Sequence, residues 1–435
     1  MLIVLERIAA WLTAFAIVFS LYAHTVLQVD SALITPISAL AIAGGLGFGS
    51  LLWLRKPAVS MPIFPGRQFG AFFLSTAWLS FVLFGLIGFQ ERSPTLNDWG
   101  LYLLTVGTLP LLLMNHARFD LLGAIGWFSV FFALADAAAN LGALAGFWQL
   151  SDAGARRVGF DYIDRLGGLT GNTHASGIVG LVAICVLSSS LSNLISMQKL
   201  QTKAISLIIS GVVIAISMYF IDARRYLLEA AVAVFLILVP AWKFVPLWVS
   251  SVTIAASGIA FTFGSFDYEN AQRANLMAAG FRDAQQHLWL GEGIFYHTPI
   301  AGPMFNDLWS AHVTESGVLD LAIDFGWVAT CTLLLGVIFT LSGWRSRLTW
   351  VASLVTVMAG ELAYGNPLDG FLGSILFFGG LISIIFDEST AIRNSITINK
   401  FEDAHQLQLG VENLEQEFHP AKFSNSLTDV VSTEH

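Results

Sequence analysis

Long apolar runs without a single charged residue recur along this chain, for example from Phe244 to Phe266 and from Phe325 to Trp344. Such a run has the length that a helix needs to cross a bilayer, about 20 residues. In hydrocarbon every backbone N–H and C=O group must be paired within its segment, so the runs are expected to be helices. Because their apolar residues do not alternate with polar ones, a membrane barrel is disfavoured. We therefore expect an all-α, polytopic integral membrane protein.

The composition agrees with this interpretation. Of the 435 residues, 55% are hydrophobic and only 12% are charged, whereas a soluble domain carries about 25% charged residues. The two cysteines, Cys185 and Cys331, fall within apolar runs and are interpreted as packing residues. The first apolar run is longer than the core of a signal peptide and lacks a small-residue cleavage site, so we expect it to be an uncleaved first span.

The apolar runs predict about twelve transmembrane spans. Their approximate limits are residues 8–28, 32–54, 69–90, 100–114, 120–148, 174–197, 204–221, 225–242, 244–264, 316–341, 348–364 and 370–386. With the N-terminus in the cytoplasm, most of the basic residues and every lysine fall on the cytoplasmic side, as the positive-inside rule requires. An even number of spans then places the C-terminus in the cytoplasm as well.

The basic residues on the outer side are all arginines, namely Arg92, Arg156, Arg157, Arg165, Arg224, Arg225, Arg273 and Arg282. Arginine presents a planar fork that binds phosphate through two hydrogen bonds, which lysine cannot do. The outer side also holds the two longest connections before the tail, about 149–173 and 265–315. We therefore expect the functional face to be periplasmic.

Two regions of different composition follow from this layout. Residues 1–386 are expected to form a transmembrane domain with one large periplasmic loop, 265–315. Residues 387–435 form a polar tail with nine Asp and Glu against three Lys and Arg. Such a composition is typical of a disordered cytoplasmic extension. The lipid bilayer is the expected surrounding of the first region, and no nucleic-acid partner is expected.

Three acidic residues, Asp136, Glu229 and Glu361, lie within predicted spans and in their outer halves. Ionisable groups inside a membrane are costly and are functional candidates by default. Glu229 follows Arg225 by four residues, so the two can pair along one helix face. Asp136 and Glu361 are open to both interpretations, a structural hydrogen bond or a functional group in a polar cavity.

Three segments carry the outer arginines in a characteristic order. They are Arg165-Leu-Gly-Gly-Leu-Thr-Gly-Asn-Thr-His174-Ala-Ser-Gly177, then Asp222-Ala-Arg224-Arg225-Tyr-Leu-Leu-Glu229, then Arg273 followed by Gly291-Glu-Gly293 and Glu315-Ser-Gly-Val-Leu-Asp-Leu-Ala-Ile-Asp-Phe-Gly326. This order resembles the superfamily of O-antigen ligases and of O-antigen and exopolysaccharide polymerases in bacterial inner membranes. The resemblance covers about residues 150–345.

The resemblance implies a metal-independent glycosyltransferase without a cofactor, acting on undecaprenyl-diphosphate-linked glycans at the periplasmic face. It implies the chain-length regulator and the flippase of the same pathway as partners. It also implies substrate contacts for Arg165, His174 and either Arg224 or Arg225, and it matches Arg273 to the family's loop arginine. The chain departs from the family pattern at His174, where Asn is usual, and at Glu315-Ser316, where His-Asn is usual.

The chemistry of this transfer assigns roles to the same residues. The leaving diphosphate needs fixed positive charge, which we expect from Arg225 and Arg273. The attacking hydroxyl needs a base, for which Glu315 and His312 are alternatives. Arg282 is a weaker candidate, because nine residues along one helix place it nearly opposite Arg273.

A polymerase of periplasmic repeat units is therefore the predicted function. A ligase that transfers a finished glycan to lipid A-core is one alternative, since it differs only in its acceptor. A transporter or flippase of lipid-linked glycans is another, although we find no paired halves of the kind that transporters show. Asp267-Tyr-Glu269 supplies too few oxygen ligands to predict a metal site.

Overall fold

The computed structural model describes residues 2–27, 31–54, 67–90, 118–147, 168–170, 173–196, 202–221, 223–239, 245–264, 268–291, 314, 316–342, 350–368 and 370–386. The described elements are helical, without a β-strand among them. They are α1 (Leu2–Leu27), α2 (Ser31–Leu54), α3 (Gln68–Gln90), α5 (Arg118–Leu144), η1 (Gly168–Thr170), α6 (Thr173–Ser196), α7 (Thr202–Phe220), α8 (Arg224–Leu238), α9 (Leu247–Gly264), α10 (Tyr268–Ala284), α11 (Gly317–Phe325), α12 (Trp327–Ser342), α13 (Trp350–Glu361) and α14 (Gly370–Phe386).

The all-α fold class is confirmed for the described residues, and most helices coincide with predicted spans. Four of these helices are long and apolar enough to cross a membrane, at Leu121–Leu144, Thr173–Ile195, Thr202–Phe220 and Leu247–Gly264. The other apolar segments among them are shorter. The predicted span 100–114 and the tail 387–435 lie outside the described residues, so the twelve-span count stays a prediction.

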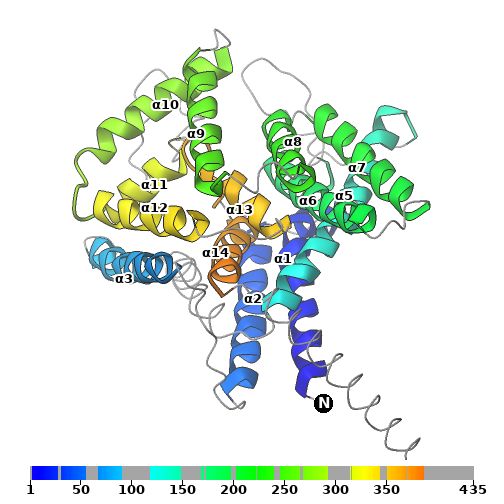
Figure 1. The fold of residues 1–435 in the computed structure, drawn as a ribbon, viewed down its shortest axis with the longest axis horizontal. Helices are drawn as coiled ribbons and strands as arrows, with labels where there is room; N and C mark the ends of the chain where they lie inside the picture. The colour runs from blue at the N-terminus through cyan, green and yellow to red at the C-terminus, as the bar shows by residue number, and fades with distance from the viewer. Residues whose placement is uncertain are drawn as a thin grey trace, which may run out of the picture. The chain divides into compact units, whose positions relative to one another are not determined.

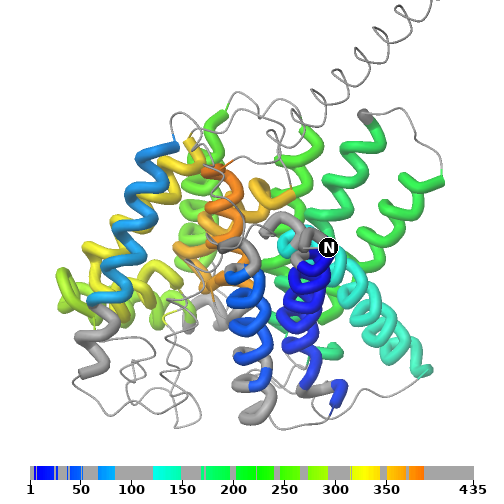
Figure 2. The backbone as a smooth tube through the Cα atoms, turned by 90° about the horizontal axis from the view of Figure 1, so that it is seen from below, coloured from blue at the N-terminus to red at the C-terminus, as the bar shows by residue number. Residues whose placement is uncertain are grey.

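The helices pack into one compact unit, Met1–Phe386, which Figures 1 and 2 show in two views. The helix α6 packs against α5, α7 and α8, and α13 packs against α9, α14, α8 and α6. The pair α3 and α12 lies in close contact because Gly70 faces Thr340 and Gly336 faces Leu74. Small residues let helix backbones approach in this way, which is typical of helix packing in membranes.

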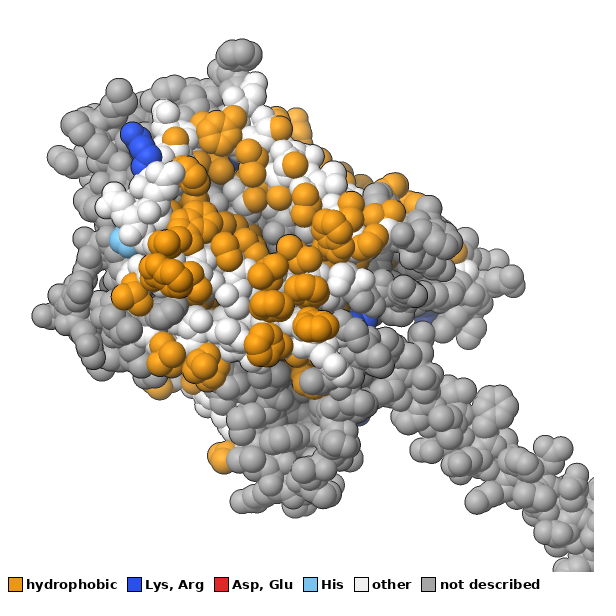
Figure 3. Space-filling view, turned by 60° about the vertical axis from the view of Figure 1, so that its left-hand side comes forward, with side chains coloured by type: hydrophobic (Ala, Val, Ile, Leu, Met, Phe, Trp, Pro, Cys, Tyr) orange, Lys and Arg blue, Asp and Glu red, His pale blue; other side chains and the backbone are white. Residues whose placement is uncertain are grey.

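Many hydrophobic side chains remain exposed on the outside of this unit. Figure 3 shows one face on which they gather, with few charged side chains among the residues described. Phe69 and Phe72 on α3 and Phe261 on α9 are each more than 60% exposed. A contiguous apolar surface of this kind is unusual for a soluble monomer and suits contact with lipid.

One predicted span is broken in the structure. The run expected as a continuous helix over 316–341 forms α11 and α12, which meet at Gly326 with φ 87°. Glycine adopts this positive φ without the penalty that a side chain brings. The first N–H groups of α12 donate instead to the large loop, Trp327 to the His287 carbonyl at 2.9 Å and Val328 to the Leu288 carbonyl at 3.2 Å. The prediction of one continuous span there was wrong.

Two further differences concern the predicted loop 265–315 and the predicted span 348–364. The helix α10 occupies part of the predicted loop 265–315, and it carries both Arg273 and Arg282. The predicted span 348–364 is a shorter helix, α13, which ends at Glu361 and continues into a turn through residues 362–368. This turn contributes to the site described below.

The side chain of Arg67 joins two helix ends. It lies directly before α3, is 1% exposed, and its Nη1 donates to the carbonyl of Ile384 near the end of α14. A cation stabilises the free carbonyls of a helix C-terminus. The start of α3 and the end of α14 therefore lie together.

Candidate functional site

The start of α8 separates the two neighbouring arginines. Successive residues on a helix point about 100° apart, so Arg224 and Arg225 face different surroundings. The side chain of Arg224 is exposed, whereas that of Arg225 is only 17% exposed and lies on the same buried face as Glu229. The structure thus distinguishes the two arginines that the sequence left open.

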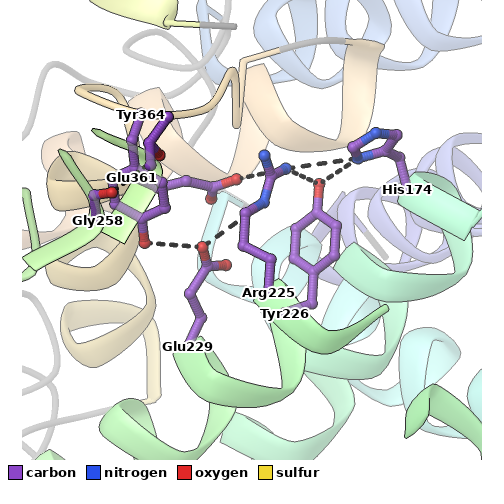
Figure 4. A network of polar contacts seen from close by, with 8 residues as sticks. His174, Arg225, Tyr226, Glu229, Gly258, Glu361 and Tyr364 are labelled. Carbon is purple, nitrogen blue, oxygen red and sulfur yellow. Dashed lines mark hydrogen bonds and ion pairs between the residues drawn. The ribbon is translucent and has the colours of Figure 1, made fainter. Parts of the chain in front are cut away.

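Arg225 is the centre of a polar cluster among α6, α8 and α13, drawn in Figure 4. Its Nη2 lies 2.9 Å from Glu361 Oε1, and its Nε lies 3.8 Å from Glu229 Oε1. The same Nη2 donates to the Tyr226 hydroxyl at 2.9 Å and lies 3.4 Å from His174 Nδ1. We define the Arg225 cluster as His174, Arg225, Tyr226, Glu229, Glu361 and Tyr364.

The two tyrosines complete the cluster on either side. The Tyr226 hydroxyl lies 3.4 Å from His174 Nδ1, and its ring lies 4.7 Å from the Arg225 guanidinium carbon. The Tyr364 hydroxyl donates to Glu229 Oε1 at 3.0 Å. His174 is the exposed member, at the first turn of α6, so the cluster opens toward its surroundings on the His174 side.

The carboxylates of this cluster are deeply buried. Glu229 is 2% and Glu361 0% exposed, and both face the single guanidinium of Arg225. Glu229 Oε2 and Glu361 Oε2 make no hydrogen bond to any described residue. A buried charge is costly unless it is paired and hydrogen-bonded. The cluster therefore holds more carboxylate than its cation can compensate.

Three glycines make room for these side chains. A Cβ on Gly177 of α6 would overlap the Tyr226 ring, and one on Gly258 of α9 would overlap the Tyr364 ring. A Cβ on Gly365 would lie 2.6 Å from Arg225 Nη1. Because side chains at these positions would displace cluster residues, the glycines are a condition for its geometry.

The end of the large loop is fastened to the turn that follows Glu361. The Gly317 N–H donates to the Gly365 carbonyl at 2.7 Å, and the Val318 N–H donates to the Leu362 carbonyl at 2.9 Å. The Ser316 side chain caps α11 by accepting from the Leu319 N–H. The backbone entering α11 is thus held beside the turn that carries Gly365.

Asp320 strengthens this junction from within α11. The Thr314 hydroxyl and N–H both donate to Asp320 Oδ1, at 2.7 and 3.0 Å. The Asn366 side-chain amide donates to Asp320 Oδ2 at 3.0 Å. Asp320 is 6% exposed, so these bonds form in a buried environment in which losing one is costly.

Asp136 performs a separate task on α5. Its Oδ1 accepts from the Leu169 N–H at 2.6 Å, in the short helix η1 that precedes α6. Gly168 has φ 65° and lies against the same carboxylate. The hydroxyls of Thr170 and Ser176 then lie 2.8 Å apart and join η1 to α6. Of the two interpretations left open for Asp136, the structure supports the structural one.

The remaining predicted residues are placed only in part. Arg273 is half-buried on α10, and Arg282 is exposed on the same helix, with its Nε donating to the Ala278 carbonyl at 3.4 Å. The described contacts of the Arg225 cluster include neither of them. Arg165, His312 and Glu315 lie outside the described residues.

Gly291, the first glycine of the predicted Gly-x-Gly segment, has a packing role. A Cβ there would overlap the backbone of Asp324 and Phe325 at the end of α11. The close approach of the two backbones explains why a glycine stands at this position. Asp267 and Gly293 lie outside the described residues, and the described part of the chain contains no group of three or more His, Cys, Asp or Glu arranged to hold a metal ion.

Sequence reasoning missed two parts of the site. Tyr226 and Tyr364 gave no recognisable signal, because isolated tyrosines in apolar helices are common. The meeting of Glu229 and Glu361 on one arginine was also missed, although both had been identified as acids inside spans. That signal could have suggested Arg225 as a partner for Glu361, since buried acids in membranes pair with basic groups.

Comparisons of the chain with family models, with curated proteins and with solved structures find no match.

Proposed function

We propose that this protein is a polysaccharide polymerase of the bacterial inner membrane. In this proposal it joins undecaprenyl-diphosphate-linked oligosaccharide repeat units at the periplasmic face of a twelve-span domain whose termini are cytoplasmic. The observation that carries the proposal is the position of Arg225, an oriented arginine beside the end of the large outer loop. Glu361 and Tyr226 fix its guanidinium at 2.9 Å each, and His174 lies next to it on the open side.

A fixed arginine suits the departure of a diphosphate. In the transfer the acceptor hydroxyl oxygen attacks the anomeric carbon of the donor, and the bond from that carbon to the diphosphate oxygen breaks. Negative charge grows on the leaving diphosphate, and a guanidinium already oriented in a partly dry site stabilises it without reorganisation. Arg225 would supply this charge, and Arg273 of the large loop would be the second clamp.

The proton of the attacking hydroxyl needs an acceptor near the same place. Glu315 stands in the sequence between Thr314, whose hydroxyl donates to Asp320 Oδ1, and Ser316, whose hydroxyl donates to the Leu362 carbonyl at 3.3 Å. Glu315 is therefore a suitable general base, with His312 as the alternative. Arg165 and His174 would contact the substrate from the other long connection. A ligase using lipid A-core as acceptor would require the same chemistry.

A transporter of lipid-linked glycans is a second candidate, and one observation favours it. The helix break at Gly326 between α11 and α12 is a feature that transporters use at their binding sites. Buried Arg and Glu pairs also occur in membrane proton relays. We rank this function lower because transport needs no oriented arginine beside a long outer loop.

The test uses the full chain in nanodiscs with an undecaprenyl-diphosphate-linked repeat unit. Wild-type protein should form a ladder of products on a gel. Arg225→Lys and Arg273→Ala should each lose this ladder, because each variant removes one of the two guanidinium groups proposed to hold the diphosphate. The exposed neighbour provides the matched control, Arg224→Lys, which should retain the ladder.

Other outcomes of this test are informative. A ladder that survives in Arg225→Lys would refute the diphosphate role of Arg225. If the wild type forms no ladder until lipid A-core is added, the ligase is the function. If the wild type forms no product with either acceptor but moves the labelled lipid across the membrane of proteoliposomes, transport is the function.

A further inference from the structure

The charge count of the Arg225 cluster is unbalanced. Glu229 and Glu361 face one guanidinium, that of Arg225. With both carboxylates ionised, these three side chains carry a net charge of −1 in a buried environment. Like charges that share such a site disfavour full ionisation.

The geometry supplies a place for one proton. Glu229 Oε1 lies 3.8 Å from Arg225 Nε and Glu361 Oε1 lies 2.9 Å from Arg225 Nη2, so the two carboxylates flank one guanidinium and either can take up a proton beside it. One oxygen of each, Oε2, has no hydrogen-bond partner among the residues described. Two buried carboxylates in this arrangement are a familiar means of holding a proton.

An anion that binds Arg225 changes this balance. Its guanidinium is already neutralised by two carboxylates, which would repel an incoming diphosphate. At 2% and 0% exposed, the carboxylates are too buried to turn toward water. If one carboxylate is protonated, it no longer compensates the guanidinium. The positive charge of Arg225 can then pair with the anionic ligand.

We propose that a diphosphate binding at Arg225 is accompanied by uptake of one proton onto the Glu229–Glu361 pair, which makes this a proton-linked anion site. The inference rests on the proposed function, in which Arg225 holds the diphosphate. The step forms one O–H bond on a carboxylate with a proton from solvent, and no electron is transferred. Each bound diphosphate would thus add one proton to the protein.

Few other groups in the described structure compete for this proton. From α6 only His174 faces the cluster, and its Nδ1 lies 3.4 Å from both Arg225 Nη2 and the Tyr226 hydroxyl. Tyr364 approaches from the turn after α13, and Arg225 and Tyr226 share α8 with Glu229. The neighbouring helices α9 and α14 contain no charged residue in their sequences.

The experiment is calorimetric titration of the full chain in nanodiscs with farnesyl diphosphate, a soluble prenyl diphosphate. At each pH between 6 and 8 it is repeated in two buffers of different ionisation enthalpy, which counts the protons taken up on binding. Wild-type protein should take up about one proton per ligand, and binding should weaken by up to about tenfold per pH unit as pH rises, by linkage. The titration of the ligand itself is measured separately and subtracted.

Glu361→Gln and Glu229→Gln provide the decisive comparison. Each removes one negative charge from the pair, so each should reduce the proton uptake and bind the diphosphate more tightly than wild type at pH 8. A merely damaged fold would weaken binding, so a gain in affinity separates the two causes. Arg224→Ala is the matched control and should leave both quantities unchanged.

The outcomes separate the inference from the proposed function. Diphosphate binding without proton uptake in the wild type overturns the inference and leaves the proposed function intact. Unchanged uptake in both glutamine variants also overturns it, because the proton then goes elsewhere. Absence of binding at every pH overturns the inference together with the diphosphate role of Arg225.

Discussion

Asp136 and Glu361 are both carboxylates buried within apolar helices, yet their surroundings differ. Asp136 is 4% exposed and accepts from the Leu169 N–H at 2.6 Å, with further hydrogen bonds from Ser176 and Asn140. Glu361 is 0% exposed, and its printed contact among the described residues is with a charged group, the Arg225 guanidinium, at 2.9 Å. The first carboxylate is satisfied by neutral donors that hold a turn, whereas the second depends on a cation that it shares with Glu229.

This difference teaches how an acid inside a span should be interpreted. A carboxylate with two or three fixed donors is a structural element, since its donors would be left unsatisfied without it. A carboxylate that shares one cation with a second acid can gain or lose a proton without breaking other hydrogen bonds. Groups whose protonation can change in this way are typical of functional sites. The sequence signal, an isolated acid in an apolar run, is the same in both cases.

The largest expected effect comes from removing the cation itself. Arg225→Met leaves two buried carboxylates without compensation, and breaking a buried ion pair in this way costs about 3–5 kcal/mol. Thermal unfolding in detergent should show a large loss of stability that shrinks as pH falls, because protonated carboxylates need no cation. Arg224→Met, on the exposed side, should change stability by no more than about 0.5 kcal/mol. Equal losses in both variants would contradict the central role of Arg225.

A smaller effect is expected at the structural carboxylate. Asp136→Ala removes the carboxylate that accepts from the Leu169 N–H and from the neighbouring side-chain donors. The free energy of unfolding should fall by about 1–3 kcal/mol, because these donors are left unsatisfied. Its destabilisation should be similar at pH 6 and pH 8, and proton uptake on diphosphate binding should persist. If Asp136→Ala abolished that uptake while Glu361→Gln did not, the comparison between the two carboxylates would be reversed.

The smallest expected stability effect is at a glycine. In Gly365→Ala the new methyl group lies 2.6 Å from Arg225 Nη1, so the guanidinium must shift. Such crowding costs about 1 kcal/mol at the low end of overpacking, but it should reduce product formation strongly because orientation is lost. Gly211→Ala on α7 is the control, since among the described residues no atom of another element lies within 4 Å of a Cβ at that position. It should leave activity unchanged and stability unchanged or higher. Full activity in Gly365→Ala would show that Arg225 does not need its observed position.

Parts of the fold and of the site could be predicted from the sequence because they depend on local chemistry. Helices such as α6 and α9 follow from uncharged apolar runs, and the pairing of Arg225 with Glu229 follows from their spacing of four residues. The break at Gly326 could not be predicted in this way. It depends on the carbonyls of His287 and Leu288, which accept from the N–H groups of Trp327 and Val328 about 40 residues later in the chain. Hydropathy carries no information about such contacts.

By itself, the sequence determined the helical class, the apolar surface and the candidates for the site, since each depends on residue type and short-range spacing. Only the tertiary structure decided that Arg225 rather than Arg224 is buried, and that Glu361 and Tyr364 reach the same place from α13 and its turn. The physical reason is that Tyr364 and Glu229 are 135 residues apart, and contacts over such separations arise from helix packing. Glycines at positions 177, 258 and 365 made that packing close enough for one arginine to meet two acids.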